Sequence, residues 1–123
     1  MAAKKLDVFI VEDDFDIRDV LTEVLQDEGY SVGGAANGRE AIDALAGGAF
    51  PRLILLDLMM PVMSGWQFVA EQRKAPSLAS IPVVVVSADG NLQQKAESLG
   101  ASGWLRKPIE IDTLLGMVRR YCR

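Results

Sequence analysis

Side chains that can do chemistry stand at four places in the sequence, each where a run of apolar residues stops. They are the acids Glu12 and Asp13, the acid Asp57, the hydroxyl of Ser87 and the amine of Lys107. Hard oxygen ligands without nitrogen or sulfur suit Mg²⁺ or Mn²⁺, and Mg²⁺ is usually shared with phosphate oxygens. These residue types therefore predict a site for a divalent cation and a phosphoryl group.

Asp57 is the predicted nucleophile of this site. It ends the aliphatic run of LILLDLMMPVMSGW, residues 53–66, so it leaves a buried strand and points a carboxylate at the strand's edge. A carboxylate that attacks phosphorus becomes an acyl phosphate. Ser87 can donate a hydrogen bond to a phosphoryl oxygen, and Lys107 can neutralise its charge. Carboxylates crowded together also need a cation, because they cannot all stay ionised cheaply.

The composition excludes several other kinds of chemistry. The 123 residues contain no histidine and one cysteine, Cys122. Serine-histidine and cysteine-histidine catalysis, histidine metal ligands and an internal disulfide are therefore excluded. The net charge of -4 offers no basic surface for nucleic acid, so no direct nucleic-acid partner is expected. Acids interrupt the first apolar run too early for a secretory signal or a membrane span, which predicts a cytoplasmic protein without membrane contact.

Five strands and five helices are needed to position these residues. Apolar runs predict strands at residues 6–11, 30–36, 53–57, 81–87 and 103–107. Apolar residues at helical spacing predict inward helix faces at Ile17, Val20, Leu21, Val24 and Leu25, at Ala41, Ile42 and Leu45, at Leu92, Ala96 and Leu99, and at Ile111, Leu114, Leu115 and Val118. Ser64 and Gln67 have the spacing of a capping box, which begins a further helix. Gly29, Gly47-Gly48 and Gly100 are predicted to end helices.

This alternation predicts an α/β protein with three layers. A doubly wound, five-stranded parallel sheet would be flanked on both faces by five helices, and 123 residues make one domain. Ligands of such sheets bind outside the carboxyl ends of the strands. The four places named above all fall at these ends, so the topology brings them to one edge.

Each of these residues also has an ordinary structural explanation. The acids at residues 12–16 can cap the helix that follows and favour its positive end. Ser87 can begin a turn, and Lys107 can be a solvated lysine. The ordinary explanations fail only jointly, because four independent accidents would have to fall on the same edge of the sheet. Asp14 and Asp16 are assigned to the helix start rather than to the metal.

Together these motifs resemble the response-regulator receiver domains of bacterial two-component signalling. The resemblance is carried by VEDD (residues 11–14), LLDLMMPVMSG (55–65), VVVVSA (83–88) and KP (107–108), at the expected separations over essentially the whole chain. It implies one receiver domain over residues 1–123 and the flavodoxin-like strand order 2-1-3-4-5. A cis peptide at Lys107-Pro108 is also implied, since only proline makes that isomer cheap.

The resemblance assigns roles to the acidic residues. Asp57 is implied to be the phosphoacceptor, with Glu12 and Asp13 as the acidic pair that serves Mg²⁺ or Mn²⁺. Asp57 itself and the backbone carbonyl of Met59 would complete the protein's share of the coordination. The positions of Met59 and Asp89 are also implied to tune the lifetime of the phosphate.

The resemblance also implies a switch. Lys107 would bind the phosphoryl group, and Ser87 would be the hydroxyl that moves toward it. Trp104 stands three residues before Lys107, where the family usually has tyrosine or phenylalanine that swings inward. Two interpretations of Trp104 stay open, namely a switch residue and a half-buried aromatic on an edge strand. Trp66 is assigned to packing.

The implied function is a phosphorylation-dependent signalling switch. The phosphoryl group would come from a sensor histidine kinase or a histidine phosphotransfer protein. The face formed by the fourth helix, fifth strand and fifth helix would then change for a downstream protein target, or for an output domain on a longer chain. Passing the phosphate on to another histidine is the alternative. The chain would catalyse at most its own phosphorylation and dephosphorylation.

Two rivals from other classes remain open. A Mg²⁺-dependent phosphohydrolase also uses an aspartyl nucleophile, but it would want a second acid two residues later, where this chain has Met59. A flavin-binding module can share the sheet order, but its phosphate loop after the first strand should be rich in glycine and hydroxyls, where this chain has EDD.

Overall fold

The structure is a computed structural model that describes residues 4–122. Strands and helices alternate along the chain as β1 (Lys4–Val11), α1 (Phe15–Asp27), β2 (Val32–Ala35), α2 (Gly38–Ala46), β3 (Ala49–Asp57), α3 (Gly65–Lys74), β4 (Val83–Ser87), α4 (Leu92–Leu99), β5 (Gly103–Arg106) and α5 (Ile111–Tyr121). The five strands form one sheet in the order β2-β1-β3-β4-β5, and all four pairings are parallel. The predicted fold class and strand order are confirmed.

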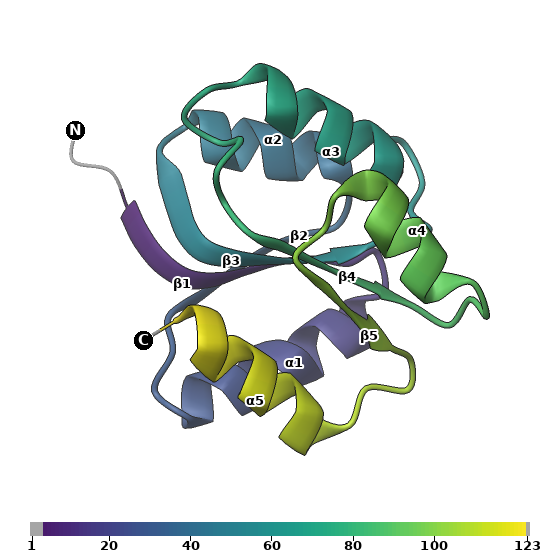
Figure 1. The fold of residues 1–123 in the computed structure, drawn as a ribbon. Helices are drawn as coiled ribbons and strands as arrows, with labels where there is room; N and C mark the ends of the chain where they lie inside the picture. Colours follow the sequence, from purple (N-terminus) through teal and green to yellow (C-terminus); the bar gives the residue numbers. More distant parts are fainter. Residues whose placement is uncertain (1–3, 123) are drawn as a thin grey trace.

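Helices cover both faces of the sheet. Figure 1 shows α2, α3 and α4 on one face and α1 and α5 on the other, so the molecule has three layers. The strand register brings the carboxyl ends of the strands to one edge, since Val11 pairs with Leu56, Asp57 with Val86 and Ser87 with Arg106.

Two apolar cores fill the spaces between these layers. Successive side chains of a strand point to opposite faces of the sheet, so β3 divides its aliphatic run between the two cores. Ile54 and Leu56 belong to the core beneath α2, α3 and α4, whereas Leu53 and Leu55 belong to the core beneath α1 and α5. All four side chains are buried. An uninterrupted apolar run is therefore what the central strand of this sheet requires.

The helix ends are largely those that the sequence predicts. Ser64 and Gln67 form the capping box of α3, with both reciprocal hydrogen bonds present. Gly29 and Gly100 follow α1 and α4 with φ of 94° and 70°, values that glycine adopts without steric cost. Asn37 accepts a hydrogen bond from the backbone of Glu40 and begins α2.

Two predicted core residues are exposed, and the strand bounds differ locally from the prediction: β1 and β3 begin earlier than predicted, whereas β2, β4 and β5 are shorter. Val20 and Ile111 are 52% and 40% exposed. Val20 lies beside the buried stripe of α1 rather than within it, and Ile111 is the first residue of α5. The strand predicted at residues 53–57 begins at Ala49, because β1 pairs with β3 from its own first residues onward.

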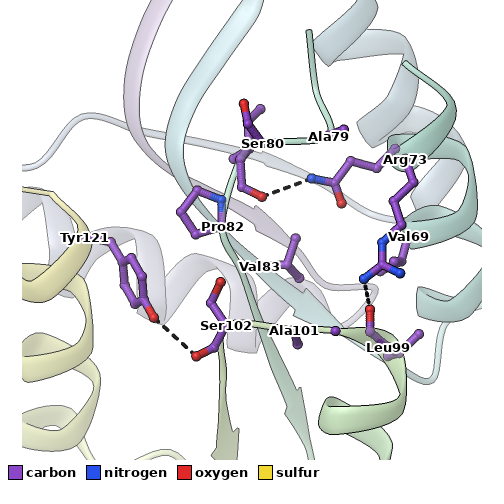
Figure 2. Close-up of a pocket in the computed structure, with 13 residues that line it drawn as sticks. Val69, Arg73, Ala79, Ser80, Pro82, Val83, Leu99, Ala101, Ser102 and Tyr121 are labelled. Atoms are coloured by element: carbon purple, nitrogen blue, oxygen red, sulfur yellow. Dashed lines mark hydrogen bonds between the residues drawn. The ribbon is translucent and has the colours of Figure 1, made fainter. Parts of the chain in front are cut away.

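At the opposite end of the strands, near the amino ends of β4 and β5, polar contacts join the neighbouring helices to one another and to the sheet. A cavity of about 270 Å³ lies there, lined by the ends of α3, α4 and α5 and by residues 79–83. Figure 2 shows its lining side chains. The Arg73 guanidinium donates to the Leu99 carbonyl, and the Tyr121 hydroxyl donates to the Ser102 carbonyl at 3.2 Å. These bonds connect α3 to α4, and α5 to the residue before β5.

Cys122 follows α5 and is buried. Its thiol lies 3.3 Å from the Asp7 carbonyl, and burial raises the pKa of the thiol to about 11. The cysteine is therefore kept protonated and packed in the core beneath α1 and α5. None of the helices within residues 4–122 has both the length and the apolar character that crossing a membrane requires.

We expect the loop between β3 and α3 to be sensitive to a single methyl group. A Cβ on Gly65 would lie 2.8 Å from the Leu58 Cα and 3.0 Å from the Asp57 carbonyl oxygen. Since these atoms are backbone, Gly65→Ala should lower the free energy of unfolding by about 1–3 kcal/mol. Gly116→Ala, in α5 with no atom within 4 Å of the new Cβ, should raise it by up to about 1 kcal/mol. Urea unfolding measures both, and equal stability of the two variants would contradict the close packing at Gly65.

Candidate functional site

The predicted site residues meet at the carboxyl edge of the sheet. Glu12 directly follows β1, Asp57 and Ser87 are the last residues of β3 and β4, and Lys107 directly follows β5. An open cavity of about 520 Å³ at this edge is lined by Asp57, Ser87 and Lys107, together with Asp13, Asp14, Ile17, Met59, Ala88 and Asp89. The topology thus brings together residues that are up to 95 positions apart in the sequence.

Three carboxylates form a compact cluster. One oxygen from each of Glu12, Asp13 and Asp57 lies within 4.8 Å of the others. Glu12 and Asp57 are buried, whereas Asp13 is exposed at the mouth of the cluster. The Asp57 Oδ1 atom accepts a hydrogen bond from the Met59 backbone N–H at 3.1 Å. This bond fixes the start of the β3–α3 loop against the acid at the end of β3.

Lys107 supplies the positive charge that faces these acids. Its Nζ atom lies 2.6 Å from Glu12 Oε1 and 3.5 Å from Asp57 Oδ2. Burial lowers the pKa of Lys107, but the hydrogen bond to Glu12 and the charges of both acids outweigh burial, and the net pKa is raised. The ammonium therefore stays charged between two buried acids.

Glu12 carries the least satisfied polar atom of the site. Within residues 4–122, Glu12 Oε2 is the buried side-chain oxygen or nitrogen that has no hydrogen-bond partner. Burial, followed by the neighbouring Asp57 carboxyl, raises the pKa of Glu12 to about 8. An unpartnered buried oxygen beside two more carboxylates is a donor set that fits a hard divalent cation.

Ser87 is buried at the end of β4, where its hydroxyl is engaged by the following loop. Its Oγ accepts a hydrogen bond from the Asp89 N–H at 3.1 Å. Asp89 lies within the β4–α4 loop and lines the same cavity. A movement of Oγ away from this N–H, toward a group on Asp57, would break the hydrogen bond.

The remaining predicted residues have clear positions. Asp14 caps α1 by accepting a hydrogen bond from the Ile17 N–H at 3.1 Å, and Asp16 lies in the first turn, so both serve the helix start as predicted. Trp104 is 39% exposed on the edge strand β5. The Lys107-Pro108 peptide bond is cis, as the resemblance implies.

Sequence reasoning missed several contacts of this site. It assigned Lys107 to a phosphoryl group and did not foresee its pairing with Glu12. It also assigned Trp66 to packing alone, whereas the Lys95 ammonium lies 5.7 Å from the centre of the Trp66 ring. No local signal identifies these pairs, because each joins different elements of the fold.

Comparisons with known proteins agree with this geometry. A family model described as the response regulator receiver domain matches residues 8–119. Sporulation initiation phosphotransferase F of Bacillus subtilis is 34% identical over 116 residues, which cover 93% of this chain and 91% of that protein. Vibrio cholerae chemotaxis protein CheY4 is similar in structure, with a TM-score of 0.83 and 37% identity over 98% of this chain and 99% of that chain.

A further solved structure is the receiver domain of the sensor histidine kinase PA1611 from Pseudomonas aeruginosa, described with a magnesium ion coordinated in its active site cleft. Its TM-score is 0.83 and its identity 25%, over 98% of both chains. The chain spans about half the length of several transcriptional regulators that it also matches. The family match, the sheet order and the similarity over nearly complete receiver chains agree: this chain belongs to the response regulator receiver domains of two-component signal transduction.

Proposed function

We propose that the chain is a phosphorylation-dependent switch in which Asp57 is the phosphoacceptor. The observation that carries this proposal is the placement of Asp57 at the end of the central strand. Its carboxylate is buried beside two further acids and lies 3.5 Å from the Lys107 ammonium. We also assign residues 1–123 to one receiver domain, and we keep the predicted cytoplasmic location as part of the proposal.

Glu12, Asp13 and Asp57 would hold Mg²⁺ or Mn²⁺, with the backbone carbonyl of Met59 as a further ligand. The unpartnered Oε2 of Glu12 and the spacing of the carboxylates within 4.8 Å support this assignment. When bound, the cation neutralises the crowded acids and draws charge from the phosphoryl oxygens. Asp13, which is exposed, would remain accessible to an arriving cation.

The reaction is a transfer between two protein side chains. A carboxylate oxygen of Asp57 attacks phosphorus, and the O–P bond forms as the N–P bond of a phosphohistidine breaks. The bonding electron pair stays on the imidazole nitrogen of the donor. Since this chain has no histidine, the donor is another protein, namely a sensor histidine kinase or a histidine phosphotransfer protein. Lys107 compensates the charge that the phosphoryl group brings.

The phosphoryl group brings about 1.5 to 2 negative charges and three strong acceptors to the carboxyl ends of the strands, in exchange for the single charge of the Asp57 carboxylate. Ser87 would leave the Asp89 N–H and donate to a phosphoryl oxygen, and the β4–α4 loop would follow. Asp89 and Met59 would tune the lifetime of the phosphate. The face of α4, β5 and α5, with Trp104 on its edge strand, would then change for a downstream protein target.

A phosphorelay role is the second candidate. It is supported by the similarity to a sporulation phosphotransferase over 91% of that protein's length. In this role Asp57 would return its phosphoryl group to a histidine of another protein. General phosphohydrolase activity is not proposed, because the position two residues after Asp57 holds Met59, which offers no acid for proton transfer.

The first test concerns the acceptor. Incubation with acetyl phosphate and Mg²⁺ should add the mass of one phosphoryl group to the intact protein, and Asp57→Asn should abolish the addition. Asp16→Asn is the matched control, since Asp16 lies in the first turn of α1 and does not line the site cavity, so the addition should be unchanged. Intact mass spectrometry measures all three proteins. Phosphoryl addition to Asp57→Asn at the native level would place the acceptor elsewhere.

The second test concerns the metal. Mg²⁺ binds only the folded state, so it should raise the temperature of thermal unfolding, and a chelator should reverse the rise. Asp13→Asn should weaken Mg²⁺ binding by at least about tenfold, because it removes a direct ligand. Asp16→Asn, in the first turn of α1, should bind Mg²⁺ like the native protein. Calorimetric titration provides the affinities, and native affinity in Asp13→Asn would remove Asp13 from the ligand set.

The third test separates phosphorylation from the switch. Ser87→Ala should still accept a phosphoryl group on Asp57, but the phosphate-induced changes in the backbone NMR signals of α4, β5 and α5 should be strongly reduced. Ser77→Ala, an exposed loop serine between α3 and β4, serves as the control. Changes of native size in Ser87→Ala would show that the hydroxyl does not couple the phosphate to this face.

A further inference from the structure

Asp89 is held at each of its four polar atoms. Its N–H donates to Ser87 Oγ at 3.1 Å, and its Oδ1 accepts from the Asn91 N–H at 2.8 Å. Its Oδ2 accepts from the Lys95 ammonium, and its carbonyl accepts from the Arg106 guanidinium at 2.7 Å. The middle of the β4–α4 loop is therefore fastened to the end of β4, to the start of α4 and to β5.

The Lys95 ammonium contacts both Asp89 and the Trp66 ring. Lys95 lies on α4 and pairs with the Asp89 carboxylate, and both side chains are about one-third exposed, at 30% and 34%. The same ammonium lies 5.7 Å from the centre of the Trp66 ring in the first turn of α3, a geometry that favours the cation. Lys95 thus connects the loop beside the phosphoacceptor to two helices.

The hydrogen bond between Ser87 and Asp89 links the contacts of Asp89 to the hydroxyl that is proposed to move in the switch. The Ser87 hydroxyl now faces the Asp89 N–H, so its movement toward Asp57 leaves that N–H without its acceptor. A loop shift that gives this N–H a new acceptor would also move Asp89 relative to Lys95, and the ion pair between the two side chains opposes such a movement. The hydrogen bond from Lys95, followed by that from the Asn91 N–H, lowers the pKa of the Asp89 carboxyl, so Asp89 is ionised at neutral pH.

We propose that Lys95 is a positioning residue that holds the β4–α4 loop in its resting conformation through Asp89 and so opposes the phosphorylated conformation. The inference rests on the proposed function, because it concerns a loop that must move when Asp57 carries a phosphoryl group. A ligand that selects a minor conformation binds with an affinity reduced by the fraction of molecules in that conformation. Removing the contact with Lys95 raises that fraction and hence the apparent affinity.

Beryllofluoride, a phosphoryl mimic that binds aspartate without phosphoryl transfer, provides the probe. Its apparent affinity is measured by NMR titration at saturating Mg²⁺ for the native protein and for Lys95→Met, which keeps the length of the side chain and removes the charge. We expect Lys95→Met to bind about two- to fivefold more tightly, the range typical of a partly exposed ion pair. Lys95→Arg, which retains the positive charge, should restore native affinity.

Two further variants separate the ion pair from general effects. Lys74→Met removes a lysine from another ion pair, with Glu71 on α3, and should leave the affinity unchanged. Asp89→Asn, whose side chain keeps an oxygen for the Asn91 N–H, should tighten binding as Lys95→Met does. The double variant should show no additional gain, because the two side chains act through one contact.

The outcomes distinguish the role of Lys95 from the phosphoacceptor role of Asp57. Native affinity or weaker binding in Lys95→Met, or an additive gain in the double variant, overturns the role of Lys95 and leaves the phosphoacceptor intact. A native protein whose Asp57 does not bind beryllofluoride overturns the proposed function and this inference together. The positioning role is supported if Lys95→Met binds beryllofluoride more tightly than the native protein and Lys95→Arg binds it with native affinity. In the Asp89→Asn background, Lys95→Met should then give no further increase in affinity.

Discussion

One ammonium group faces two buried carboxylates, and the chemistry of the site follows from this imbalance. Lys107 lies between Glu12 and Asp57, and Asp13 adds a third acid at the mouth of the cluster. A single positive charge cannot compensate all of them in a medium of low polarity. Burial, followed by the neighbouring Asp57 carboxyl, raises the pKa of Glu12 to about 8, and the Oε2 atom of Glu12 has no hydrogen-bond partner. The arrangement is thus suited to receive a further cation.

The fold keeps this excess of negative charge in place, because it holds the acids close together at the ends of the strands. β3 lies in the middle of the sheet with an apolar core on each face, so Asp57 is held at the end of a rigid strand. The next residues turn back immediately, since the Gly65 N–H donates to the Leu58 carbonyl at 3.1 Å. Stability is concentrated in the cores, whereas the residues that react stand on the edge.

The β4–α4 loop is organised in a different way. Its conformation depends on polar contacts around Asp89 rather than on burial, and such contacts are individually weak and can exchange partners. This is a suitable basis for a switch, because a new charge on Asp57 competes with contacts of similar strength. The far end of α4 is held separately, where Arg73 from α3 donates to the Leu99 carbonyl (Figure 2). The first half of α4 is thus restrained by the β4–α4 loop and by Trp66 of α3, and its end by Arg73 of α3.

The sequence by itself determined the fold class and which residues gather at the site. Continuous apolar runs such as VVVV require strands buried on both faces, and the acids, Ser87 and Lys107 follow these runs at strand ends that parallel topology brings together. The prediction was wrong at the margins of the buried helix faces. Val20 and Ile111 were predicted to face inward but are exposed, because helical spacing identifies the centre of an apolar face and not its limits.

Only the tertiary structure decided which charged groups face one another. Glu12 and Lys107 are 95 residues apart, and Asp89 and Arg106 are 17 apart, so neither pair leaves a local pattern in the sequence. The pairing depends on strand register and on how the helices pack, and so does the raised pKa of Glu12, which arises from burial. Sequence pattern specifies which residues reach the edge of the sheet, whereas distances and desolvation exist only once the chain has folded.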